Sequence, residues 1–362
     1  MAQLVRAPPC HGGGRRFESD LGRFGVLAQL GEHLPYKQRV IGSSPIGPIF
    51  ILIYSSLEGS KLFSTTLLYL LLEDNGGNNV ITIITDSASD IVDNRREDLI
   101  VLPITISFDE EEFQDGVNLT HREFYERLIE SDKLPVTSQI PPAVFEKAYA
   151  EATKHGDEVI VITMSSKFSG TFQSANIGAE NYQGKVHIVD SENASLGERI
   201  LVEYALQLKD KGLSVKEIIE ELDTQKKNIR LIALLDTLEY LKKGGRISKA
   251  AAVAGEILSI KPVITVRGGE VAVLGKARGS KQGNNLLAEE IKRANGIDYE
   301  MPFILAYSGL TDAVIQKYID DHESLWKGIV ERPVPASVGG TIGTHVGPGA
   351  IGIAFFAVSN NS

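Results

Sequence analysis

The chain has 362 residues, 43% hydrophobic and 23% charged, which is enough for about two globular domains with ordinary cores. Its formal net charge of −10 argues against a broad nucleic-acid-binding surface. The single cysteine, Cys10, excludes an intramolecular disulfide and a thiolate metal cluster, and we expect no metal site. Such cysteine usage is typical of a cytoplasmic protein.

Two apolar runs, residues 49–54 and 67–72, are the candidates for membrane insertion. Both are much shorter than the roughly 18 apolar residues that a membrane-spanning helix needs. The N-terminus also lacks the succession of regions that defines a signal peptide. We therefore expect no stable membrane insertion and a cytoplasmic location.

The first 79 residues differ from the rest of the chain. Residues 1–48 show no helical or strand periodicity and contain breakers such as Pro8-Pro9 and Gly12-Gly13-Gly14. One interpretation is a disordered basic tail. The other is an artefactual extension, because parts of this stretch resemble spurious translations of transfer-RNA genes. In that case the native chain starts at Val80, directly before the first strand pattern.

Residues 80–226 alternate between short apolar runs and helical patterns. This alternation is typical of right-handed βαβ units and predicts an α/β domain with a mainly parallel sheet. Ligands bind such sheets beyond the carboxyl ends of the strands, where this chain places serines. The predicted strands are residues 80–85, 99–108, 158–164 and 185–189, and the predicted helices are 121–131, 141–155, 172–181, 198–211 and 215–226.

A second α/β domain is predicted over residues 227–358, with the domain boundary near residue 226. Its first half contains a Gly-rich elbow at Gly244-Gly245 and a small-residue helical pattern. The predicted strands are residues 230–235, 262–266, 270–275, 303–307 and 351–357, and the predicted helices are 248–258, 285–293 and 311–320.

Two hydroxyl-bearing segments are candidate anion sites. Thr137-Ser138-Gln139 stands before a helix that begins with proline, and Ser165–Thr171 lies between a strand and a helix. Hydroxyls and free amides at helix starts can hold an anion, although an ordinary helix cap uses the same residues. The second segment matches neither the P-loop nor G-x-G-x-x-G, which weakens a nucleotide-binding interpretation.

A serine-dependent esterase is the alternative enzyme hypothesis. It would use Ser169 as the nucleophile and His345 as the base. Lys167 and Thr171 stand where a nucleophile elbow has glycines, so this hypothesis needs a different local geometry.

The segment 339–349 contains the densest group of glycines and is predicted to be a loop that approaches a ligand closely. His345 lies within it and could donate a hydrogen bond to an anion, although an isolated histidine is often structural. Arg246 and Arg278 are cations on predicted loops, and solvated surface charge is the simplest interpretation of both.

Six separated motifs together resemble the DegV family. They occur in the family's order and extend over residues 81–357, the whole globular part of the chain. The motifs are Thr85-Asp86-Ser87-Ala88-Ser89-Asp90, Thr137-Ser138-Gln139, Ser165-Ser166-Lys167-Phe168-Ser169-Gly170-Thr171, Leu241-Lys242-Lys243-Gly244-Gly245-Arg246-Ile247-Ser248, Lys276-Ala277-Arg278-Gly279 and Thr344-His345-Val346-Gly347-Pro348-Gly349.

The resemblance implies a carrier rather than an enzyme. Family members hold a long-chain fatty acid, such as palmitate or oleate, between two α/β domains and need no cofactor. A separate ATP-dependent kinase subunit of a bacterial fatty acid kinase then phosphorylates the bound carboxylate.

The resemblance also implies roles for individual residues. Thr137 and Ser169 would bind the carboxylate, with Ser138 adjacent and His345 nearby, and Arg246 and Arg278 would dock the kinase. This chain departs from the family where Ile140-Pro141-Pro142 replaces Pro-Ser, which makes the role of Ser138 less secure than that of Thr137.

Overall fold

The computed structural model describes residues 80–92, 96–154, 157–247 and 260–358, together with four short strands nearer the N-terminus. The chain divides into two compact units, residues 1–78 and 79–362. In the first unit β1 (Leu52–Tyr54) pairs with β4 (Thr66–Leu68), and β2 (Leu57–Glu58) pairs with β3 (Lys61–Leu62), both antiparallel. Apart from these four strands, residues 1–79, where we expect a tail or an artefactual extension, lie outside the described residues. The helix predicted at 248–258 also lies outside them.

The second unit begins with a four-stranded parallel sheet in the order β11-β10-β5-β6. The short runs of Val, Ile and Thr favour strands, and β5 and β10 are buried along nearly their whole length, as expected of central parallel strands. The predicted α/β class with a mainly parallel first sheet is therefore confirmed. The strand bounds are β5 (Ile81–Asp86), β6 (Leu99–Leu102), β10 (Glu158–Thr163) and β11 (Val186–Asp190).

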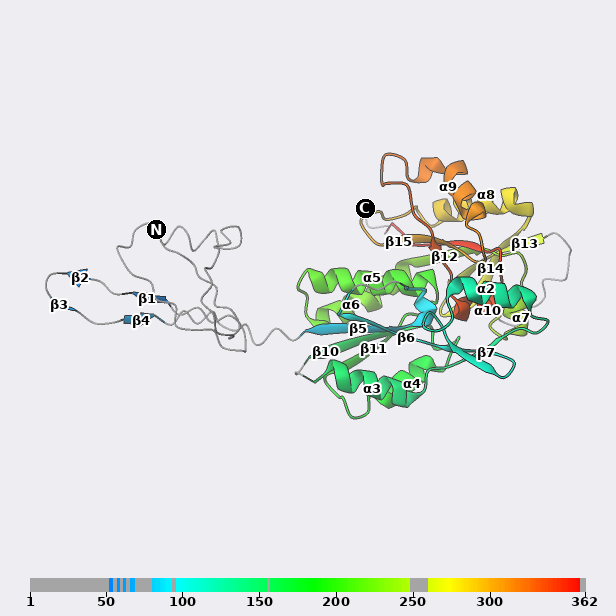
Figure 1. The fold of residues 1–362 in the computed structure, drawn as a ribbon. Coiled ribbons are helices and arrows are strands. Elements are labelled where there is room, and N and C mark those ends of the chain that lie inside the picture. Colours follow the sequence, from blue (N-terminus) through cyan, green and yellow to red (C-terminus); the bar gives the residue numbers. More distant parts are fainter. Residues whose placement is uncertain are drawn as a thin grey trace, which may run out of the picture. The chain divides into compact units, whose positions relative to one another are not determined.

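Helices cover both faces of this sheet (Figure 1). On one face α3 and α4 pack against each other, and on the other lie α5 and α6. A Ser or Thr capping box begins α2 and α6. The helix bounds are α2 (His121–Glu130), α3 (Pro142–Ala152), α4 (Thr171–Gly178), α5 (Leu196–Asp210) and α6 (Val215–Gln225).

The single strand predicted at 99–108 is wrong. The chain breaks at Pro103, because proline has no N–H to donate to a strand ladder. After the break, β7 (Thr105–Phe108) joins β8 (Glu111–Gln114) and β9 (Val136–Ser138) in a separate three-stranded antiparallel sheet. Thr137 and Ser138 consequently lie on a strand rather than at a helix entrance.

A six-stranded sheet forms the second half, in the order β14-β13-β12-β17-β15-β16. All its neighbours are antiparallel except β15 and β16. The strands are β12 (Ile229–Leu234), β13 (Ile260–Arg267), β14 (Glu270–Arg278), β15 (Phe303–Tyr307), β16 (Ala336–Ser337) and β17 (Ile351–Phe356). The helices of this half are α7 (Glu239–Lys243), α8 (Gly279–Arg293), α9 (Ala313–Asp321) and α10 (Gly340–Val346).

Helix α5 lies between the two large sheets (Figure 1). It is apolar around most of its circumference, and one continuous core joins residues of the first sheet, such as Ile83, to residues of the second, such as Leu231 and Ala354. The boundary predicted near residue 226 falls between α6 and β12. No helix within the described residues is long and apolar enough to cross a membrane.

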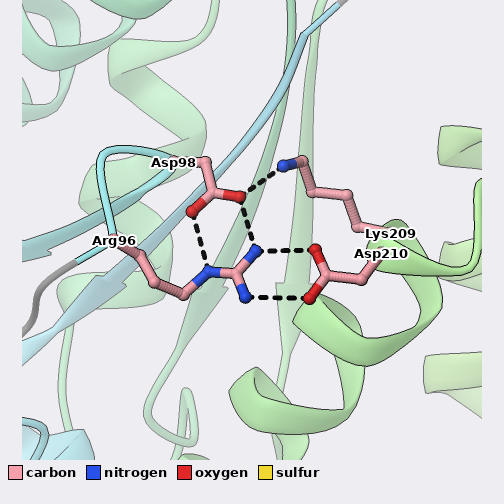
Figure 2. Close-up of polar contacts among 4 residues, drawn as sticks. All are labelled: Arg96, Asp98, Lys209 and Asp210. Atoms are coloured by element: carbon pink, nitrogen blue, oxygen red, sulfur yellow. Dashed lines mark hydrogen bonds and ion pairs between the residues drawn. The ribbon is translucent and has the colours of Figure 1, made fainter. Parts of the chain in front are cut away.

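An ionic network fixes the C-terminal end of α5 (Figure 2). The Arg96 guanidinium donates to both oxygens of Asp98, at 2.7 and 2.8 Å, and to both oxygens of Asp210. Lys209 also pairs with Asp98. Arg96, and to a lesser degree Lys209, lower the pKa of the Asp98 carboxyl. The segment before β6 is thereby attached to α5.

Candidate functional site

An apolar cavity extends through the core beside the start of α5. Aliphatic residues of β12, β13, β15 and β17 line it, together with Leu196 and Ile342 from helices α5 and α10. Five of the six residues implicated by sequence also line it: Thr137, Ser138, Ser169, Arg246 and His345.

Hydrogen bonds join several of the polar lining residues to neighbouring elements. Thr137 Oγ1 lies 3.2 Å from His345 Nε2, which joins β9 to α10. Gln139, two residues further along, donates from Nε2 to Ser174 Oγ at 3.0 Å and packs against Gly170 at the start of α4. The cavity is therefore apolar along its length and polar where β9, α4 and α10 meet.

His345 is a neutral imidazole at neutral pH. Burial, and to a lesser degree the charge of Arg246, lower its pKa to about 4. Nδ1 is buried and has no hydrogen-bond partner among the described residues, and the Cα of Gly244 packs against it. Nε2 is thus the ring nitrogen that can bond a ligand or Thr137.

The loop predicted at 339–349 is wrong, because residues 340–346 form helix α10. The glycines permit close packing on α2 and β7 rather than a flexible loop. A Cβ on Gly343 would lie 2.5 Å from Phe124 Cε1, and one on Gly340 would lie 2.6 Å from Ile106 Cδ1. This packing places His345 beside Thr137.

Ser169 follows β10 at the entrance to α4. Its Oγ lies 2.9 Å from Thr171 Oγ1 and accepts a hydrogen bond from Thr171 N at 3.2 Å. In this arrangement it satisfies a free amide of the first helical turn, although the N-cap residue of α4 is Gly170. Its hydroxyl also lines the cavity, where the N-terminal end of α4 favours negative charge.

The two arginines differ in position. Arg246 is half-buried, lines the cavity, and donates from Nε to Phe168 O at 3.1 Å and from Nη1 to Gly244 O at 2.6 Å. Arg278 is exposed at the end of β14, where it precedes α8, and does not line the cavity. Helix α8 begins at Gly279 rather than residue 285, so Arg278 lies at a helix start rather than in a loop.

The esterase geometry is not present in the described residues. Ser169 bonds to Thr171 and His345 to Thr137, and no hydrogen bond connects the first pair to the second. His345 Nδ1 has no carboxylate to orient the ring. An imidazole with a pKa of about 4 is also a poor general base at neutral pH.

Sequence reasoning missed most of the apolar lining. Ala233, Gly352 and Ala306 lie side by side on β12, β17 and β15 and all line the cavity. Strand patterns predict alternation, but only the pairing register shows which residues meet. Asp90 and Asp115, whose carboxylates accept hydrogen bonds from the amides of residues 339–341, likewise carry no individual signal in the sequence.

Comparison with known proteins identifies close relatives. Residues 80–358 match the family described as uncharacterised DegV-family proteins. A DegV domain-containing protein of Caldanaerobacter subterraneus is 34% identical over 280 residues, which cover 76% of this chain and 98% of the relative.

Solved structures show the same fold. A fatty-acid-binding DegV protein of Thermus thermophilus is 32% identical with a TM-score of 0.70, over 77% of this chain and 99% of that protein. A Eubacterium eligens DegV protein loaded with heptadecanoic acid is 26% identical with a TM-score of 0.66, over 76% and 99%. The linoleic-acid-loaded fatty acid kinase B3 protein of Streptococcus pneumoniae, 22% identical with a TM-score of 0.67 over 77% and 99%, shares the fold.

Proposed function

Because this chain belongs to the DegV family, we propose that it binds one long-chain fatty acid between its two α/β halves, residues 80–226 and 227–358. The acyl chain occupies the apolar cavity, and the carboxylate lies at Thr137, Ser169 and His345, with Ser138 beside them. The observation that supports this proposal most directly is one cavity with an aliphatic lining and a cluster of uncharged hydrogen-bonding groups.

The aliphatic lining suits an acyl chain such as that of palmitate or oleate. Burial of an acyl chain contributes about 0.8 kcal/mol per methylene. A dozen methylenes therefore contribute on the order of 10 kcal/mol before the entropic cost of ordering the ligand. Because burial of the acyl chain supplies most of the binding free energy, the polar residues need to orient the carboxylate more than to attract it.

The polar cluster is suited to orienting a carboxylate without neutralising it. Threonine and serine hydroxyls and a neutral His345 can each donate one hydrogen bond. Arg246 directs its described hydrogen bonds to the carbonyls of Phe168 and Gly244. A carboxylate held by neutral donors keeps an oxygen available as a nucleophile.

We infer that the protein is a carrier without turnover of its own and that it presents the carboxylate to a separate kinase subunit. A carboxylate oxygen would attack the terminal phosphorus of ATP held by that subunit. The bond to ADP would break, and an acyl phosphate would form. Arg278, which is exposed, and Arg246, at the cavity, would dock the kinase. The name of the streptococcal structural neighbour agrees with this role.

Mass spectrometry of the purified full chain tests the binding proposal. Protein from a bacterial host, denatured before analysis, is expected to release one equivalent of a long-chain fatty acid. Delipidated protein is then titrated with palmitate and oleate. Absence of co-purified lipid together with absence of binding to both acids would reject the carrier function.

A further inference from the structure

Two carboxylates from the first half of the unit accept hydrogen bonds from the backbone amides at the start of helix α10. Asp90 Oδ1 accepts a hydrogen bond from Gly339 N at 2.7 Å. Asp115 accepts from Gly340 N through Oδ1 and from Thr341 N through Oδ2, both at 3.0 Å. Asp90 and Asp115 are 1% and 3% exposed, so three successive amides are held away from solvent by two buried carboxylates.

This helix needs such support. It has only seven residues, and its glycines lower helix propensity by about 1 kcal/mol each. The glycines cannot be replaced freely, because Gly340 and Gly343 contact Ile106 and Phe124 at close range. Negative charge at a helix start and hydrogen bonds to its free amides offset the loss.

His345 lies at the opposite end of the same short helix. Its contact with Thr137 crosses from the second half of the unit back to the first. The helix is one short element of seven residues, so a shift of its first turn away from the two aspartates would be transmitted to the imidazole at its far end. The position of the ring therefore depends on the amides at residues 339–341.

We propose that Asp115, supported by Asp90, is a positioning residue that fixes His345 at the polar end of the cavity. This inference rests on the proposed fatty-acid function, since it gives His345 its ligand. Neither aspartate lines the cavity, so both would act through α10 rather than by contact with the fatty acid.

Several ionisable groups surround the two carboxylates. Ser195 Oγ donates to Asp90 Oδ2 at 2.5 Å, and Arg199 Nη1 donates to the backbone carbonyl of the same residue. Burial raises the pKa of Asp90 to about 7. Asp86, Glu198, His121 and Tyr125 each interact electrostatically with one or both of these carboxylates.

The substitution Asp115→Asn tests the proposal in ligand-free protein. The histidines are isotopically labelled, and the His345 signal is identified by its loss in His345→Gln. We expect the His345 pKa to rise from about 4 towards the ordinary value of about 6.5 as the ring becomes hydrated. Removal of a negative charge alone would lower an imidazole pKa, so a rise reports displacement of the ring.

The same variant should bind palmitate about tenfold more weakly, the effect of losing one charge-assisted hydrogen bond. Asp98→Asn is the matched control, because Asp98 belongs to the ionic network of Figure 2 and does not line the cavity. It should lower stability and leave the His345 pKa unchanged. An unchanged His345 pKa in Asp115→Asn would overturn the proposal even if palmitate binds, whereas a raised pKa in a protein that binds no lipid would reject only the proposed function.

If Asp115→Asn does not fold, amide hydrogen exchange of the unchanged protein provides the test. The amides of residues 339–341 should be protected as strongly as those of α2, on which α10 packs. Exchange of these three amides at the rate of an unstructured chain would show that the carboxylates do not hold the helix, and the proposal would fail.

Discussion

The hydroxyl of Thr137 lies 3.2 Å from Nε2 of His345, although 208 positions separate the two residues in the chain. The contact connects a three-stranded sheet in the first half to a short helix in the second. Both side chains line the cavity, so a ligand head group at this point would meet both halves of the unit.

Thr137→Val removes the hydroxyl and preserves the shape of the side chain. We expect palmitate to bind about tenfold more weakly, because one donor to the carboxylate is lost and His345 Nε2 loses its partner. Isothermal titration of delipidated protein measures the change. Thr105→Val is the matched control, since Thr105 is on the adjacent strand β7, bonds to Gln114, and does not line the cavity. Equal losses in both variants would contradict a specific role for Thr137.

Ser169→Ala should weaken fatty-acid binding and slow acyl-phosphate formation by the kinase. It also removes the hydrogen bond from Thr171 N, and loss of such a bond costs about 0.5–1.5 kcal/mol of stability. Affinity and the free energy of unfolding are therefore measured together. Ser166→Ala changes an exposed serine of the same loop that does not line the cavity, and it should leave affinity unchanged. Wild-type affinity in Ser169→Ala would remove this residue from the site.

The sequence predicted the large sheets well because buried strands require uninterrupted apolar runs. The patterns around β10 and β17 are of this kind and needed no tertiary information. Strand β9 could not be predicted in this way, because it has three residues and forms only through pairing with β7. Pro103 marks the break between β6 and β7 in the sequence itself.

The candidate site was predicted in part. Thr137, Ser138, Ser169, Arg246 and His345 were selected through family motifs, and the structure places all five on one cavity while their roles remain predictions. Helix α10 could not be predicted, because its glycines are typical of loops. In the structure these glycines allow close packing against Phe124 and Ile106. In a sequence, a group of glycines indicates a turn or loop. Only the neighbouring side chains in the structure show that these positions need glycine for close packing.

Arg278→Ala should leave fatty-acid affinity intact and slow phosphorylation of the bound acid by the kinase. The residue is exposed and does not line the cavity, so we expect its loss to affect only docking. Arg293→Ala, at the other end of α8, is the control and should change neither quantity. Kinetics of acyl-phosphate formation at several kinase concentrations measure the effect. Unchanged kinetics in Arg278→Ala would exclude this arginine from docking.

Arg246→Ala should instead change both binding and phosphorylation. Its guanidinium holds the carbonyl of Phe168, next to Ser169, so removal would loosen the loop that carries the hydroxyl. We expect a several-fold loss of palmitate affinity in addition to slower phosphorylation. A variant with normal affinity would show that Arg246 acts in docking alone.

The buried imidazole of His345 makes stability depend on pH. Its folded-state pKa of about 4 lies below the unfolded value of about 6.5, so the unfolded chain binds more protons between these values. The stability associated with the neutral ring is complete above pH 6.5 and is lost as pH falls towards 4. The loss is on the order of 2–3 kcal/mol, after allowance for partial exposure of the ring.

Urea unfolding of the wild type and of His345→Gln at pH 7.5 and 4.5 isolates this contribution from that of the buried carboxylates. Burial raises the pKa of Asp86 and Asp90 to about 7, so their protonation favours the folded state as pH falls and opposes the effect of His345. Both proteins share these carboxylates, and their contribution cancels in the difference. The wild type should therefore lose 2–3 kcal/mol more than His345→Gln on acidification. Parallel losses in the two proteins would mean that folding does not lower the pKa of His345 below its ordinary value.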